Sequence, residues 1–267
     1  MNPLEFEIDR WREYALALRF TKPEDAEKDY IQELLLSELF NGKDWANLVF
    51  RGGTAISKVY GSGRFSEDLD FITIKEADAS ELETYVKKSI ERLGLRYHIE
   101  YKKVRYRNML KYSLKIKGPI YAVALNEQAK QTIGIDLNLY ERPMLEVLEV
   151  DRVPIYDDAR PYAANVLSKE ELIADKAKAI LERTEPVARD LYDMWFLAMK
   201  YGIRLDIKLT SRKMLAYGKR ENRLFSMSML NKKIRQIERI WDKEMGRLIL
   251  NPPSYKKVVS ELEGLLK

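Results

Sequence analysis

The chain has 267 residues, a net charge of +5, one histidine and no cysteine. The missing cysteine excludes disulfides and thiolate metal sites, and a single histidine is too few for the usual zinc sites. No stretch is long and apolar enough to span a membrane, and the charged start MNPLEFEIDRWREY differs from a signal peptide, so we expect a cytoplasmic protein with no membrane partner.

Helices and strands alternate in the predicted structure up to residue 139. The helices expected in this part cover residues 4–19, 24–40, 54–60 and 79–93. Short apolar or alternating runs predict strands over residues 47–50, 69–74, 95–106, 111–117, 120–125 and 132–139. This order predicts an α/β (α+β) fold, in which helices flank a mixed β-sheet.

The pattern becomes helical from Ser168 onward, where Ser168-Lys169-Glu170-Glu171 resembles a capping box. The helices expected in this half cover residues 168–182, 187–200, 208–217, 226–246 and 254–266. We therefore expect two domains. A sheet domain with N-terminal helices would cover residues 1–160, and a helical domain over residues 161–267 would contribute to the same cleft.

The segment FRGGTAISKVYGSGRFSEDLDF, residues 50–71, carries the clearest chemical pattern. Gly52-Gly53-Thr54 leaves a strand and opens a helix, and the free backbone N–H groups at a helix start bind anions. Asp68 and Asp70 share one face of the next strand, while Leu69 between them faces the core. Two such carboxylates repel each other without a cation, and Mg²⁺ binds one or two carboxylates together with phosphates. The segment therefore predicts a site for a nucleotide and a metal.

Part of this segment, GGTAISKVYGSGRFSEDLDF, resembles the first motif of the AbiEii-type nucleotidyltransferase toxins, a branch of the DNA polymerase β-like nucleotidyltransferase superfamily. The spacer from Thr54 to Asp68 is longer here than in minimal members of the superfamily. The resemblance implies a nucleotidyltransferase fold and the transfer of a nucleoside monophosphate from an NTP, with Mg²⁺ or Mn²⁺ as the metal. It also implies a toxin of a toxin–antitoxin or phage-defence system, with a cognate antitoxin and a tRNA 3′ end as the acceptor.

The same resemblance selects the residues of this motif that would bind the nucleotide. They are Gly52, Gly53, Thr54, Lys58, Arg64 and Ser66. From the residues alone, Arg64 and Ser66 fit a loop beside the phosphates and an ordinary surface loop equally well.

Asp136, in the apolar strand IGIDLNL, is the candidate for the third carboxylate that the superfamily requires. An unpaired carboxylate in such a strand is unfavourable, so the alternative is a residue at a strand end or in a salt bridge. As a metal ligand beside Asp68 and Asp70, Asp136 would help to deprotonate the attacking hydroxyl.

Two patterns in the helical half resemble further motifs of the family. Asp175-Lys176, with Ala179 and Arg183, resembles its lysine helix, and residues 189–193 (RDLYD) resemble its Arg-Asp-x-x-Asp motif. Lys176 and Asp193 are the expected catalytic residues here, since a lysine at the cleft neutralises triphosphate charge and Asp193 orients it. Lys176 and Asp190 are also expected to contact the nucleotide, and Arg189 to be structural. The alternative is an interhelical salt bridge between these two helices.

Residues 101–117 contain seven basic residues and no acidic one, interleaved with tyrosines. This pattern fits an RNA backbone with stacked bases, and it also fits an ordinary edge strand. Basic residues near the C-terminus either bind nucleic acid or coat the helices, namely Arg220, Arg223, Lys232, Lys233, Arg235 and Arg239. Two other functions stay open: a nucleotidyltransferase that modifies a protein hydroxyl or a small molecule, and a non-catalytic module that binds nucleic acid.

Overall fold

The computed structural model describes residues 3–42, 47–106, 108–218 and 224–263, so Arg107, Arg220 and Arg223 lie outside the described residues. The helices of the sheet half are α1 (Pro3–Leu18), α2 (Pro23–Phe40), α3 (Gly52–Lys58), α4 (Ala79–Leu93) and α5 (Pro119–Ala124), with a short 3-10 turn at Glu127–Ala129. Its strands are β1 (Leu48–Arg51), β2 (Leu69–Thr73), β3 (His98–Tyr106), β4 (Met109–Lys117), β5 (Gln131–Asn138), β6 (Leu148–Arg152) and β7 (Tyr162–Val166). The helical half contains α6 (Lys169–Glu182), α7 (Ala188–Tyr201), α8 (Ile207–Tyr217), α9 (Met227–Ile237), α10 (Trp241–Leu248) and α11 (Tyr255–Glu263). Within the described ranges, every helix is too short or too polar to cross a bilayer.

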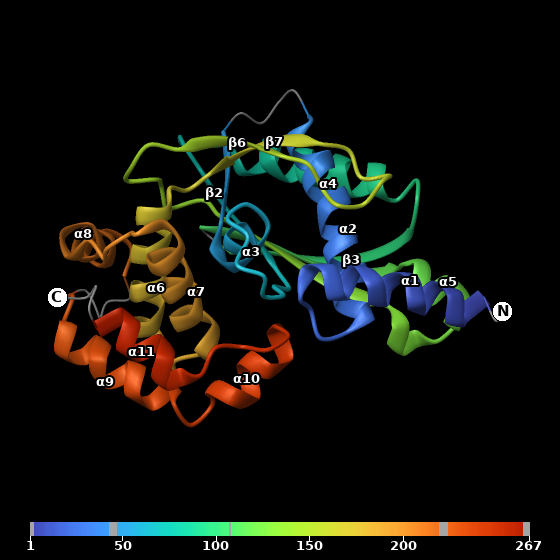
Figure 1. Cartoon of the computed structure of the whole chain (residues 1–267). Coiled ribbons are helices and arrows are strands. Elements are labelled where there is room, and N and C mark those ends of the chain that lie inside the picture. The colour runs from blue at the N-terminus through green and yellow to red at the C-terminus, as the bar shows by residue number, and fades with distance from the viewer. Residues whose placement is uncertain (1–2, 43–46, 107, 219–223, 264–267) are drawn as a thin grey trace.

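A seven-stranded mixed sheet with the order β3-β4-β5-β2-β1-β7-β6 forms the centre of the sheet half. β1 runs antiparallel to β2, and β2 runs parallel to β5. Figure 1 shows α2 and α4 on one side of this sheet, α3 on the other, and the helical half gathered beyond α3. The prediction of a mixed sheet with flanking helices and a helical C-terminal half is confirmed.

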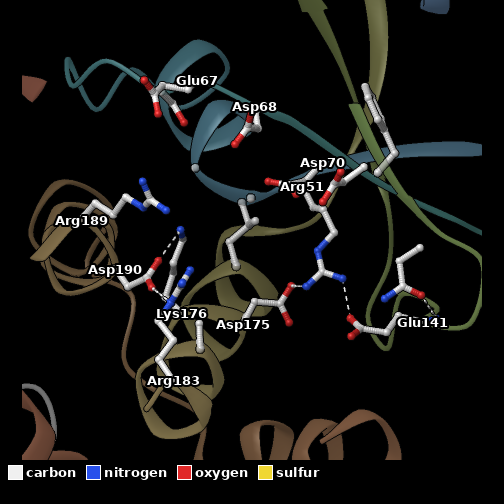
Figure 2. Close-up of a pocket in the computed structure, with 18 of the residues that line it drawn as sticks. Arg51, Glu67, Asp68, Asp70, Glu141, Asp175, Lys176, Arg183, Arg189 and Asp190 are labelled. Atoms are coloured by element: carbon white, nitrogen blue, oxygen red, sulfur yellow. Dashed lines mark hydrogen bonds and ion pairs between the residues drawn. The ribbon is translucent and has the colours of Figure 1, made fainter. Parts of the chain in front are cut away.

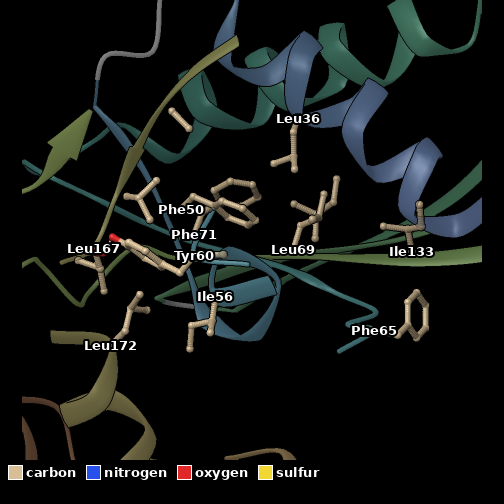
Figure 3. Close-up of a cluster of buried hydrophobic side chains, with 14 of the residues drawn as sticks. Leu36, Phe50, Ile56, Tyr60, Phe65, Leu69, Phe71, Ile133, Leu167 and Leu172 are labelled. Atoms are coloured by element: carbon tan, nitrogen blue, oxygen red, sulfur yellow. Dashed lines mark hydrogen bonds between the residues drawn. The ribbon is translucent and has the colours of Figure 1, made fainter. Parts of the chain in front are cut away.

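Alternation along the central strands separates the core from the charged face. Phe50 of β1 and Phe71 of β2 stack with ring centroids 5.3 Å apart, and both lie against Phe40 of α2. Figure 3 shows this apolar layer above the sheet, with Ile56 of α3 packed below it. Because side chains alternate in a strand, the neighbouring residues of β1 and β2 face the helical half instead.

Two helix ends of the helical half follow the capping rules read from the sequence. The Ser168 hydroxyl accepts a hydrogen bond from the Glu171 N–H (3.2 Å) at the start of α6. Gly202, with a φ of +67°, ends α7 in the left-handed conformation that favours glycine. Both boundaries therefore result from local chemistry.

The structure differs from the prediction in three segments. Residues 120–125, expected as a strand, form all of α5 after Pro119 together with its C-cap, because Pro119 opens a helix and the Glu27 carboxylate of α2 accepts the Ile120 N–H (2.6 Å). Residues 226–246, expected as one helix, are divided into α9 and α10, and this break buries both Ile237 and Trp241. The sheet continues past residue 160, the expected end of the sheet domain, because β7 pairs with β1 and β6.

Candidate active site

A row of four charged residues crosses the face of the sheet that looks toward the helical half. In the strand register, Arg51 of β1 lies opposite Asp70 of β2, Asp70 beside Asp136 of β5, and Asp136 opposite Lys111 of β4. Lys111 forms an ion pair with Asp136. Asp68 precedes β2 on the same face, and its carboxylate accepts the Gly134 N–H (3.2 Å). The three predicted carboxylates are thus brought to one face of the sheet.

Two glycines allow the backbone to approach these acids closely. Gly52 has a φ of +75°, and a Cβ atom at this residue would lie 2.4 Å from Asp70 Oδ2. A Cβ atom at Gly134 would lie 2.5 Å from Asp68 Oδ1. Any side chain at either residue would therefore displace a carboxylate.

The cleft between the sheet and α6–α7 has a volume of about 270 Å³ and contains most of the predicted site. Figure 2 shows Asp68 and Asp70 on the sheet side and Lys176, Arg183 and Arg189 on the helical side. Of the predicted residues, those that line the cleft are Gly52, Gly53, Arg64, Ser66, Asp68, Asp70, Asp136, Lys176 and Asp190. The sheet and the helical half therefore form one site.

The helical wall of the cleft is built on a buried ion network. Arg64 binds Asp193 with two parallel contacts (2.6 and 2.7 Å), and Lys176 Nζ lies 2.8 Å from Asp193 and 2.9 Å from Asp190. Arg183 contacts the second oxygen of Asp190 (2.9 Å). The predicted interhelical salt bridge between α6 and α7 thus exists, and it belongs to the cleft wall.

These ion pairs set the protonation states of the network. Burial acts to lower the pKa of Lys176, but Asp190 and Asp193 outweigh it and hold this pKa above its ordinary value. Burial acts to raise the pKa of Asp190, but Lys176 and Arg183 hold it below its ordinary value. Lys176 therefore stays cationic and Asp190 stays anionic at neutral pH.

Asp70 is in a different electrostatic environment. Burial raises the pKa of Asp70 to about 6, and Asp136 and Asp68 add to this rise while Arg51 and Lys176 oppose it. Among the described residues, no cation lies within ion-pair distance of its carboxylate, because Arg51 is turned to Glu141 and to Asp175 (2.7 Å). In the described part of the chain, Asp70 and its neighbour Asp68 both lack a counter-ion, whereas Asp136 is paired with Lys111.

The sheet wall of the cleft, which carries Asp68, Asp70 and Asp136, has oxygen ligands that fit a divalent cation such as Mg²⁺. Asp68 and Asp70 offer carboxylate oxygens on one face, and Asp70 has no counter-ion within the described ranges. Mg²⁺ commonly takes one or two carboxylates and completes its shell with phosphates and water. The described residues contain no preformed cluster of three or more metal-ligating side chains, and Asp136 faces Lys111. Asp68 and Asp70 are therefore the residues that would hold the metal, with Asp136 beside them.

Three predicted site residues do not line the cleft. The buried Thr54 hydroxyl lies 2.9 Å from Ser66 Oγ and donates to the Asp68 carbonyl oxygen (2.5 Å), so it braces the loop before β2. Asp193 is fully buried behind Lys176. Lys58 is placed elsewhere: its Nζ contacts Asp29 (2.5 Å) and Glu33 on α2. We therefore leave Lys58 out of the proposed site.

Arg51 and its partner Glu141 were not predicted from the sequence. Arg51 contacts Glu141 and Asp175, and Asp175 also contacts Lys213 of α8 (2.5 Å). A signal was present, since a charged residue ends the apolar run of β1 directly before the glycines. The basic residues Lys232, Lys233, Arg235 and Arg239 lie on α9 or directly after it and do not line the cleft.

The fold and the cleft define a nucleotidyltransferase. Two solved structures share the fold: a protein from H. pylori described as a candidate nucleotidyltransferase (20% identity, 89% of this chain and 91% of that chain, TM-score 0.55) and MenT4, a nucleotidyltransferase toxin from Mycobacterium tuberculosis (19% identity, 97% and 99%, TM-score 0.53). A comparison with curated proteins gives no match. The chain belongs to the family described as nucleotidyl transferase AbiEii toxin of type IV toxin–antitoxin systems, whose model matches residues 34–261. The resemblance inferred from the glycine and aspartate motifs is therefore confirmed.

Proposed function

We propose that this enzyme transfers a nucleoside monophosphate from an NTP to a hydroxyl group of RNA, such as a tRNA 3′ end, in a reaction that requires Mg²⁺ or Mn²⁺. The observation that carries the proposal is the uncompensated Asp70 beside Asp68 and Asp136, facing Lys176 across the cleft. In the cell, this activity would make the protein a cytoplasmic toxin in phage defence, held in check by an antitoxin.

The chain can bind a triphosphate from two sides. Gly52 and Gly53 present backbone N–H groups at the start of α3, where anions are stabilised. Opposite them, Lys176, Arg183 and Arg189 line the cleft, and Arg189 has no carboxylate within ion-pair distance among the described residues. This arrangement favours a highly charged anion and orients it between the two walls.

Asp136 is positioned to take the proton from the acceptor. The acceptor oxygen forms a bond to the α-phosphorus, the bond from this phosphorus to the β-phosphate oxygen breaks, and pyrophosphate leaves with that electron pair. The hydroxyl proton moves to Asp136, which lies beside Asp70 in the register and is paired with Lys111 until it takes up the proton. A bound divalent metal would supply Lewis-acid stabilisation of phosphate charge at Asp68 and Asp70.

The test is label transfer from each α-labelled NTP to total tRNA, with Mg²⁺, with Mn²⁺ and with EDTA. We expect label in RNA for the wild type with metal, and none with EDTA, for Asp68→Ala or for Asp70→Ala. Asp151→Asn, an exposed acid on β6, is the matched control and should transfer normally. Label in the protein fraction alone would identify a protein acceptor instead. Transfer that survives both substitutions would overturn the site.

A further inference from the structure

The face of the sheet that carries Asp136 continues beyond it over β4 and β3, where no helix of the described residues covers the exposed Ser113 and Lys115. In register, Gly134 of β5 lies opposite Ser113 of β4, and Ser113 lies opposite Lys102 of β3. Strand spacing puts Lys102 roughly 14 Å from Asp68 across this surface. We call this surface the open face, formed by Lys102, Val104, Tyr106, Met109, Lys111, Ser113, Lys115, Thr132 and Gly134.

Alternation in β4 shows that the open face is not part of the core. The other face of β4 carries Leu110, Tyr112, Leu114 and Ile116, and all four are buried. On the open face, Ser113 and Lys115 are exposed, and on the edge strand β3 Val104 and Tyr106 are 46% and 58% exposed. The face is thus open to solvent and joins the cleft at Met109, which lines both, beside Asp136.

The open face has a positive charge that the fold does not neutralise. Among the described residues, neither Lys102 nor Lys115 has an acid within ion-pair distance, whereas Lys103, on the opposite face of β3, pairs with Glu83 of α4. Glu100 is the acid of β3 on this side; it lies opposite Lys115 in the register and contacts His98 (3.4 Å) and Lys130 (3.7 Å). Lys102 lies closer to the carboxylates than Glu100 does, so the part of the open face nearest to them is basic.

We propose that the open face holds the single-stranded RNA segment next to the attacking hydroxyl. The inference rests on the proposed function, because phosphates bound at Gly52-Gly53 and the helical wall leave the opposite side of Asp136 for the acceptor, as in-line transfer requires. Lys102 and Lys115 contact the RNA backbone, and the exposed ring of Tyr106 stacks on a base. Of the predicted basic run, Tyr101, Lys103, Arg105 and Tyr112 lie on the other face and do not contribute.

The contribution of charge is tested by measuring the binding of a labelled single-stranded RNA of about 12 nucleotides. Fluorescence anisotropy at increasing NaCl concentrations reports this binding. Lys102→Gln combined with Lys115→Gln should weaken binding roughly 10- to 30-fold at about 0.1 M salt and reduce the salt slope by about 1.4, as expected for two lost phosphate contacts. Lys103→Gln combined with Arg105→Gln is the matched control, with the same charge change on the opposite face of the same hairpin. Equal losses in both double variants would overturn the proposal.

The stacking part is tested at Tyr106. Tyr106→Ala should weaken RNA binding roughly 5-fold or more, and Tyr106→Phe should restore it, because stacking requires the ring and not the hydroxyl. Equal RNA binding by the alanine variant and the wild type would show that Tyr106 does not contact the RNA. Circular dichroism of each variant shows that the exposed substitutions leave the fold intact.

Label transfer separates failure of this proposal from failure of the proposed function. If the wild type transfers label to RNA, the Lys102/Lys115 variant should show a raised KM for RNA with an unchanged KM for the NTP. Transfer with both KM values unchanged would overturn the open face and leave the function standing. The wild type could instead transfer no label to RNA while the Lys102/Lys115 variant still loses RNA binding relative to its control. That result would contradict the proposed function and support the open face as an RNA-binding surface.

Discussion

The sheet wall and the helical wall of the cleft hold charge in opposite ways. On the helical wall, Asp190 and Asp193 are buried, and each contacts two cations. On the sheet wall, Asp70 lies beside Asp68 and Asp136 and has no cation at ion-pair distance among the described residues. Paired buried charge is typical of a structural scaffold, and unpaired buried charge is unfavourable unless a ligand compensates it. Asp190 and Asp193 thus hold the cleft together through their ion pairs, whereas the described residues leave the charge of Asp70 uncompensated.

The largest expected effect is on catalysis at the sheet wall. Asp70→Asn keeps the side-chain shape but removes the charge that would bind the metal, so label transfer should fall on the order of 10³-fold or more. Asp151→Asn on the edge strand β6 should transfer at the wild-type rate. An Asp70→Asn variant within tenfold of the wild type would show that Asp70 is not an essential ligand.

Substitutions in the ion network of the helical wall should lower the free energy of unfolding. Asp193→Asn leaves Arg64 and Lys176 with an uncharged partner in a fully buried site, and we expect a loss of about 3–5 kcal/mol in the free energy of unfolding. Arg183→Gln removes the outermost cation of the same network, whose side chain is 41% exposed, and should cost less than about 1 kcal/mol. Urea unfolding of both variants measures the difference. Similar losses would mean that burial does not control this network.

Local spacing predicted the sheet wall well. The glycine turn and the shared face of Asp68 and Asp70 follow from strand and helix geometry within a short segment. Asp136 was found from the family resemblance, which implies a third carboxylate on a neighbouring strand, and β5 places it beside Asp70. Partners that are distant in the chain could not be predicted in this way. Arg64 and Asp193 are 129 residues apart, and their contact depends on how α7 packs behind the loop before β2.

The errors in the prediction also have tertiary causes. Residues 120–125 form a helix because Glu27, far away in sequence, accepts the Ile120 N–H. The family resemblance predicts Lys58 at the nucleotide, but α2 packs on that side of α3 and supplies Asp29 and Glu33. Sequence spacing gives the face of a helix, and only packing determines what that face meets.

Lys58 offers a direct check of this correction. Lys58→Met should lower the free energy of unfolding by roughly 2–4 kcal/mol, because Asp29 loses its cation while Glu33 keeps Arg152 (2.8 Å). Activity per folded molecule should stay at the wild-type value, since Lys58 does not line the cleft. A large rise in the KM for the NTP, with normal stability, would return Lys58 to the nucleotide site.

The smallest effect is a gain in stability at the sheet wall. The pKa of Asp70 is about 6 in the folded chain, against roughly 3.9 in an unfolded one, so folding favours the protonated acid. Asp70 therefore stabilises the fold fully below about pH 4, and this contribution is lost as the pH rises to about 6. In metal-free buffer, the free energy of unfolding of Asp70→Asn should exceed that of the wild type by roughly 1–3 kcal/mol above pH 6 and equal it near pH 4. Urea unfolding across this range, with Asp151→Asn as the control, measures the difference. A variant less stable than the wild type at pH 7 would show that Asp70 is compensated within the fold, and the contrast between the two walls would then fail.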